Sequence, residues 1–180
     1  MIYLVAASIL AAVGAVTAWL EFHEVSSKVE VLNPENKKGT ALVIYQKGLR
    51  DFQTKVAFAF AKSFVANKWR VEITTVSPLA PTQLSSYDIL VIVWPTYFFS
   101  PSLQIRRYLR KIGDLEGKRI IIICTATGAP AGSCEKMKSL VQGANGNVVK
   151  FVTLYTMRPN EGNGDPLAIA ANIGKEIQLP

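Results

Sequence analysis

The side chains that most often carry out covalent or acid–base chemistry are scarce in this chain. Among 180 residues there are one histidine, His23, and two cysteines, Cys124 and Cys134. These counts exclude a cysteine-rich disulfide scaffold and argue against a zinc site of usual composition. His23 lies before the predicted folded body, so the sequence also excludes a Ser-His-Asp hydrolase and a Cys-His nucleophile.

The two cysteines are expected to differ in environment. Cys124 ends an apolar run and is expected to be an inert core residue. Cys134 lies near the start of a predicted helix, where the pKa of a thiol can fall. The sequence requires no disulfide, which agrees with a reducing compartment.

The predicted secondary-structure elements, which must position any functional side chains, alternate between strand and helix. Short, nearly continuous apolar runs predict five strands that are buried on both faces, at 40–46, 70–76, 87–94, 118–125 and 148–154. Apolar residues at helical spacing predict helices at 54–68, 101–112, 134–142 and 166–177. This alternation predicts right-handed crossovers and a parallel sheet with helices on both faces.

Three loops follow the carboxyl ends of these strands, where doubly wound sheets bind ligands. They are 46–54, 95–101 and 125–134. The sequence contains neither G-x-x-x-x-G-K-[ST] nor G-x-G-x-x-G, so the common glycine-rich phosphate loops are absent. The first strand ends in Tyr45-Gln46 and the third in Trp94-Pro95, where a receiver domain would carry acids.

Three segments resemble the flavodoxin family, and the resemblance extends over residues 40–177. They are IYQKGLRDFQTKVAFAFAKSF, YDILVIVWPTYFFSPS and GKRIIIICTATGAPAG. The resemblance implies an α/β fold, namely a flavodoxin-like three-layer α/β/α sandwich with a five-stranded parallel sheet in the order 2-1-3-4-5. It also implies a site for flavin mononucleotide (FMN), with no catalytic side chain and no metal.

Carried over by position, the resemblance assigns contacts to each part of FMN. The phosphate would lie at a helix N-terminus, which favours anions, near Gln46, Lys47, Gly48, Leu49, Arg50, Phe52, Gln53 and Thr54. The isoalloxazine ring would lie beside Pro95, Thr96, Tyr97 and Phe98, because aromatic side chains stack on such rings. The polar edge of the ring would meet Thr125, Ala126, Thr127 and Gly128.

The chain departs from the family pattern at several of these positions. Gln46, Lys47 and Arg50 stand where the family has hydroxyl residues. Lys47 and Arg50 would supply charge-assisted contacts instead. Asp51 places a carboxylate where a dianion should lie, or serves as an N-cap. Trp94 stands where the family has a small residue and is expected to fill part of the ligand space.

The first twenty residues carry no charged side chain. About 19 apolar residues at 1.5 Å each cover the hydrocarbon thickness of a bilayer. This predicts a transmembrane anchor at 1–20, a juxtamembrane linker at 21–39 and a flavodoxin-like domain at 40–180. The alternatives are a cleaved signal peptide ending near Val16-Thr17-Ala18 and a buried core helix. Because every lysine and arginine follows this segment, the body is expected on the cytoplasmic side of the cell membrane.

The net charge of +7 points to anionic partners. Arg106, Arg107, Arg110 and Lys111 form one basic helix face, which is either simply solvated or contacts anionic lipid headgroups. No recognition motif supports nucleic acid. The leading hypothesis is a membrane-anchored FMN protein, either an electron carrier or an FMN-dependent oxidoreductase, that exchanges electrons with a membrane-associated redox protein. The alternative is a flavin-free interaction module of a membrane assembly.

Overall fold

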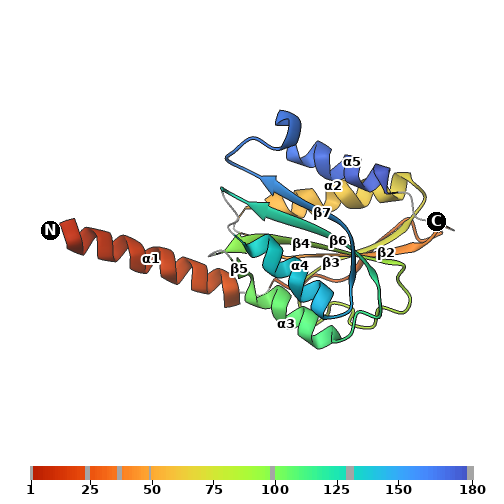
Figure 1. Cartoon of the computed structure of the whole chain (residues 1–180), viewed down its shortest axis with the longest axis horizontal. Helices are drawn as coiled ribbons and strands as arrows, with labels where there is room; N and C mark the ends of the chain where they lie inside the picture. Colours follow the sequence, from red (N-terminus) through yellow and green to blue (C-terminus); the bar gives the residue numbers. More distant parts are fainter. Residues whose placement is uncertain are drawn as a thin grey trace.

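The computed structural model describes residues 2–22, 25–35, 38–48, 50–97, 100–128 and 132–177. Its body is a three-layer sandwich, and a long N-terminal helix projects from it (Figure 1). Within these residues the helices are α1 (Ile2–Phe22), α2 (Phe52–Ala66), α3 (Leu103–Ile112), α4 (Ser133–Gly143) and α5 (Pro166–Glu176), with a short 3-10 turn at Glu161–Asn163. The strands are β1 (Glu30–Leu32), β2 (Thr40–Tyr45), β3 (Arg70–Thr75), β4 (Ile89–Tyr97), β5 (Ser100–Pro101), β6 (Arg119–Ala126) and β7 (Asn147–Tyr155).

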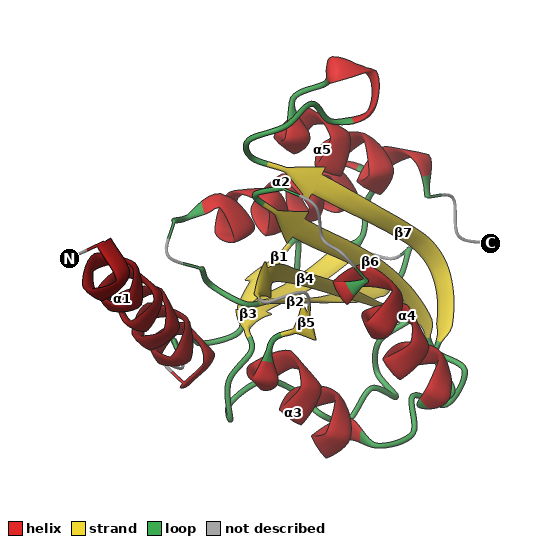
Figure 2. Ribbon diagram, turned by 60° about the vertical axis from the view of Figure 1, so that its left-hand side comes forward, coloured by secondary structure: helices red, strands yellow, loops and turns green. Residues whose placement is uncertain are grey.

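The sheet has the strand order β1-β3-β2-β4-β6-β7, and β5 pairs with β4. The five predicted strands are β2, β3, β4, β6 and β7, and their parallel pairing in the order 2-1-3-4-5 is confirmed. The prediction of a purely parallel, five-stranded sheet is wrong. β1 lies antiparallel to β3 at one edge, and β5 folds back antiparallel on β4 (Figure 2). β1 arises from the segment that the sequence places in a linker.

Each face of the sheet is covered by its own hydrophobic core. Val43, Val91 and Ile121 face α2 and α5, whereas their chain neighbours Ile44 and Ile92 face α3 and α4. Strands that carry apolar side chains on both faces must be covered on both faces, which is why they read as continuous apolar runs. This arrangement leaves polar side chains to the ends of the strands.

The prediction of a transmembrane helix, and with it a cell-membrane location with a cytoplasmic body, is wrong. Within the described residues, no helix has the length and apolar character needed to cross a bilayer. Helix α1 itself runs over 21 residues, Ile2–Phe22. Nor is α1 a core helix, because Tyr3 and Leu10 are 90% and 72% exposed.

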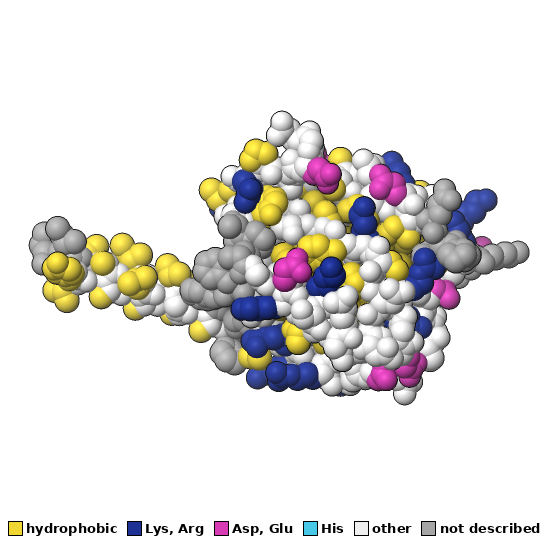
Figure 3. Space-filling model, viewed as in Figure 1, with side chains coloured by type: hydrophobic (Ala, Val, Ile, Leu, Met, Phe, Trp, Pro, Cys, Tyr) yellow, Lys and Arg dark blue, Asp and Glu magenta, His cyan; other side chains and the backbone are white. Residues whose placement is uncertain are grey.

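The surface of the body is unevenly charged. Lys and Arg side chains gather over the part of the body nearest α1, where α3 lies, and apolar side chains cover α1 itself (Figure 3). On α3, Arg107, Arg110 and Lys111 are exposed, whereas Ile105 and Leu109 are buried. The predicted amphipathic pattern is therefore confirmed at these positions, whereas Arg106, also predicted on the basic face, is half-buried.

Helices α2 and α5 pack closely because α5 has a glycine at their contact. A Cβ atom on Gly174 would collide with the hydroxyl oxygen of Ser63 and lie 3.1 Å from the carbonyl oxygen of Phe60. We expect Gly174→Ala to lower the free energy of unfolding by about 1–3 kcal/mol through overpacking. Chemical denaturation measures the change. Gly143→Ala is the control, since nothing lies within 4 Å of its added Cβ, and it should be neutral or slightly stabilising.

A polar cluster on β3 makes stability depend on pH in acid. Glu72 accepts hydrogen bonds from Tyr87 Oη at 2.6 Å and Arg70 Nη2 at 2.7 Å. Burial raises the pKa of Glu72, but these hydrogen bonds and the Arg70 charge outweigh burial and hold it below its ordinary value of 4.5. The stabilisation is therefore complete above that value and lost as the pH falls through the lower pKa of the folded state.

We expect Tyr87→Phe to weaken this effect, because it removes one of the hydrogen bonds that lower the pKa of Glu72. The variant should lose less stability than the native chain between pH 5 and pH 3. Urea unfolding at several pH values measures this loss. If the variant and the native chain lost the same free energy of unfolding between pH 5 and pH 3, the role assigned to Tyr87 would be contradicted.

Candidate functional site

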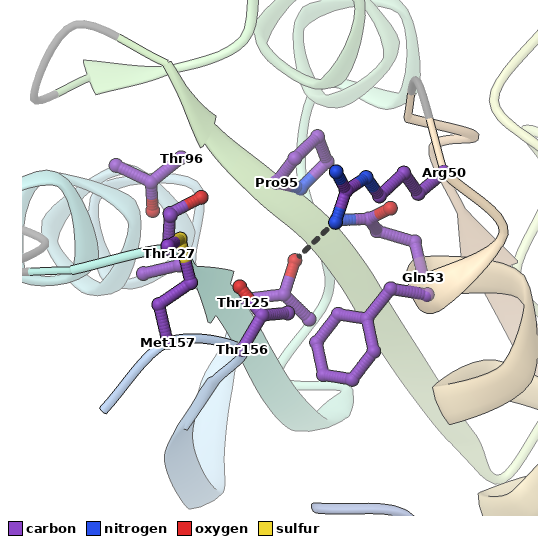
Figure 4. Close-up of a pocket in the computed structure, with 10 residues that line it drawn as sticks. Arg50, Gln53, Pro95, Thr96, Thr125, Thr127, Thr156 and Met157 are labelled. Carbon is purple, nitrogen blue, oxygen red and sulfur yellow. Dashed lines mark hydrogen bonds between the residues drawn. The ribbon is translucent and has the colours of Figure 1, made fainter. Parts of the chain in front are cut away.

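A cavity of about 300 Å³ lies at the carboxyl edge of the sheet. This volume is at the small end of the range for ligand pockets. The wall combines the start of α2, the ends of β4 and β6 and the turn after β7 (Figure 4). Its residues are Arg50, Phe52, Gln53, Pro95, Thr96, Thr125, Ala126, Thr127, Thr156 and Met157. β2 lies between β3 and β4, so this edge is the topological switch point at which such sheets bind ligands.

The structure brings part of the predicted contact set together around this cavity. The predicted residues in its wall are Arg50, Phe52, Gln53, Pro95, Thr96, Thr125, Ala126 and Thr127. Gly128 follows Thr127 and is exposed. Leu49 and Phe98 lie outside the described residues. Tyr97 belongs to β4, but its side chain is also outside the described part.

Four predicted residues lie away from the cavity wall. Gln46 is buried, and its side-chain oxygen accepts a hydrogen bond from the Ser102 hydroxyl. Lys47 forms an ion pair with Asp51 at 3.5 Å. Gly48 follows Lys47 in the chain. The Thr54 hydroxyl is buried beside the phenol of Tyr45, whose pKa is raised by burial and lowered in part by this neighbour.

The start of α2 offers a site for an anion. Asp51 occupies the N-cap position, but its side chain makes no capping hydrogen bond, and its carboxylate pairs with Lys47 instead. The first N–H groups of a helix have no partner within the helix, and they form its positive end. Arg50 adds a guanidinium group to the same wall. The cavity therefore favours a negatively charged group at this end.

A buried chain of hydrogen bonds ties α2 to the sheet. Gln53 Nε2 donates to Thr125 Oγ1 at 2.8 Å, and Thr125 Oγ1 donates to the carbonyl oxygen of Trp94 at 3.0 Å. Figure 4 shows the first of these bonds at the back of the cavity. Because both side chains are buried, this chain fixes the distance between the first turn of α2 and the end of β6.

The expectation that Trp94 fills ligand space is wrong. Trp94 is fully buried on the opposite face of the sheet, in the core formed with Ile105 and Cys124. Its neighbour Pro95 lines the cavity instead. Successive side chains of a strand point to opposite faces, so this large ring packs beneath α3 and α4 and leaves the cavity open.

Sequence reasoning missed Thr156 and Met157, which line the cavity from the turn after β7. The signal was present, because the carboxyl end of the last parallel strand lies at the same edge as the others. Met157 is 78% exposed and forms part of the rim. Next to it, Arg158 stacks on the ring of Tyr155 with 4.6 Å to the ring centroid.

The wall residues can bind a ligand, but they offer little acid–base chemistry. The ionic side chain among them is that of Arg50. Their other polar groups are amide and threonine hydroxyl groups, and Phe52, Pro95 and Met157 supply apolar surface. Among the described residues, no cluster of His, Cys, Asp or Glu could hold a metal ion. The site therefore suits an amphipathic ligand with an anionic end.

Comparisons with known proteins identify the fold. No family model and no curated protein sequence matches the chain. Among solved structures, a flavodoxin from Streptococcus pneumoniae superposes with a TM-score of 0.61 at 10% identity, covering 76% of this chain and 96% of that one. Flavodoxin 2 from Bacillus cereus gives 0.62 at 14% identity, covering 75% and 94%. An NAD(P)H:quinone oxidoreductase from Methanothermobacter marburgensis gives 0.60 at 12% identity, covering 79% and 100%. The chain thus has a flavodoxin-like fold.

The hydrogen bond between Gln53 and Thr125 makes a prediction about stability. We expect Thr125→Val to lower the free energy of unfolding by about 1–3 kcal/mol, because it leaves the buried amide of Gln53 unpaired. Thr127→Val is the control, because Thr127 is exposed, and it should have little effect. In the double variant Gln53→Leu/Thr125→Val, most of the loss should be recovered. Denaturant titration of all variants tests this, and additive losses would contradict the pairing.

Proposed function

We propose that the chain binds FMN in the cavity at the carboxyl edge of its sheet and exchanges electrons with a redox protein. It would act as an electron carrier or as an FMN-dependent oxidoreductase. One observation carries the proposal: in a flavodoxin-like fold, the switch-point cavity is walled by an uncapped helix start and by Arg50.

The residues around the cavity fit such a ligand in two respects. The first turn of α2 and Arg50 would hold the phosphate, because both favour a dianion. Pro95, Thr96, Thr125 and Thr127 would hold the flavin ring, with the Thr127 hydroxyl and backbone groups facing its polar edge. When bound, FMN supplies the transfer of one or two electrons, so the protein itself needs no acid or base.

The rim of the cavity suits exchange with a protein partner. Thr127, Thr156 and Met157 are exposed, whereas Thr125 and Gln53 at the back are buried. The back of the site therefore excludes water, while the rim stays open for a docked protein. Phe52 and Met157 would cover apolar parts of the ligand and keep water from them.

A flavin-free interaction module is the second candidate function. It is favoured by Asp51, whose carboxylate lies immediately before α2, where it would repel a phosphate unless Lys47 keeps it neutralised. In that case the cavity would be a remnant of the fold, and the exposed surface would carry the function.

Titration of the full chain with FMN separates the two candidates. We expect FMN fluorescence to be quenched on binding, and Arg50→Glu to weaken binding at least tenfold by placing a carboxylate beside the phosphate. Lys62→Glu is the matched control, because it makes the same charge change farther along α2, and it should alter affinity less than twofold. FMN fluorescence that stays unchanged at high micromolar protein would favour the flavin-free module.

A further inference from the structure

The two cysteines, far apart in the sequence, lie in one buried cluster of the fold. Cys124 is in β6, and Cys134 is the second residue of α4, which covers that face of the sheet (Figure 1). Both are free thiols, 0% and 5% exposed, and they belong to the same core. Neither has a part in the proposed binding of FMN.

Threonine hydroxyls hold the two thiols against each other. Thr153 in β7 is the register partner of Cys124, and its hydroxyl lies 3.5 Å from Cys134 Sγ. Thr153 thus places the Cys134 thiol next to the position that Cys124 occupies on the neighbouring strand. On the other side, a hydrogen bond of 3.1 Å joins Cys124 Sγ to the hydroxyl of Thr96. The two thiols therefore lie close to the same threonine within one core of the fold.

The environment makes the two thiols unequal. The hydrogen bond from Cys124 lowers the pKa of Cys134, and it outweighs the opposite effects of burial and of Glu135. The same contact, together with burial, raises the pKa of Cys124. Cys134 also lies in the first turn of α4, whose positive end favours a thiolate. Cys134 is thus the more acidic thiol of the pair, and Cys124 the less acidic.

The cavity gives small molecules a route to this pair. Thr96 both lines the cavity and bonds to Cys124, so the Cys124 thiol lies one side chain behind the cavity wall. Of the two thiols, Cys134 is the one that keeps some exposed surface, and it is the more nucleophilic of the two.

We propose that Cys124 and Cys134 form a redox-active pair that hydrogen peroxide converts to an intramolecular disulfide. The Cys134 thiolate attacks one peroxide oxygen, which breaks the O–O bond and gives a sulfenic acid and hydroxide. The Cys124 sulfur then attacks the Cys134 sulfur, and the sulfenic oxygen leaves as water after taking up a proton. Overall, two thiols and one peroxide give one disulfide and two waters, so two electrons pass from sulfur to oxygen.

The test uses the full chain without added FMN. The chain is exposed to peroxide, quenched in acid, alkylated with N-ethylmaleimide in denaturant and weighed by mass spectrometry. We expect both thiols to be lost together, with a mass decrease of two hydrogens relative to the unalkylated chain, and dithiothreitol to restore both. Because no flavin is present, this result is independent of whether FMN binds.

Two variants test the assigned roles. In Cys124→Ala the oxidation should stop at Cys134, where dimedone traps the sulfenic acid at one adduct per chain. In Cys134→Ala the rate of thiol loss should fall at least tenfold, because Cys124 is buried and stays protonated. Circular dichroism checks that each variant is folded, and the native chain alone decides the main result if either is not.

Several outcomes would overturn the proposal. In the native chain, three results would do so. The thiols could remain free at excess peroxide, disulfides could form between chains, or Cys134 could be overoxidised without forming a disulfide. Faster oxidation of Cys124 than of Cys134 would also overturn it, because it would reverse the roles that the contacts assign.

Discussion

The architecture depends on one constraint: its central parallel strands are buried on both faces. Leu42, Ile92 and Ile122 have no exposed surface, so the middle of the sheet cannot hold a polar ligand. The chain leaves β2 towards α2 on one face and β4 towards α3 on the other (Figure 1). These connections diverge, and the cavity opens between them at the carboxyl edge.

The cavity divides into a fixed back and an open front. At the back, Gln53 and Thr125 satisfy each other and hold α2 against β6. At the front, Arg50 and the exposed threonines have room to meet a ligand. Thr96 connects this site to the cysteine pair behind it. The fixed back can hold one end of a ligand in place, while the open front lets a partner protein reach the other end of that ligand.

The sequence predicts the central sheet well because burial on both faces leaves an unambiguous pattern, as in 118–125. It does not predict β1, because a strand of three residues, two of them exposed, is too short to carry a periodic signal. It places Trp94 in the ligand space because a family position does not say which face of a strand a side chain takes. The cysteine contact was out of reach, since the packing of α4 on β6 brings together residues from separate elements. At the N-terminus, composition alone suggested a membrane span that the described helix does not support.

The most direct measurement is a backbone amide NMR spectrum of the ¹⁵N-labelled chain during addition of FMN. If FMN binds in the cavity, we expect shifts confined to the start of α2 and the ends of β4 and β6, with the largest at Phe52, Gln53, Thr96 and Thr127. Shifts at the opposite, amino edge of the sheet, near Thr40 and Arg119, would contradict it. So would a spectrum that FMN leaves unchanged.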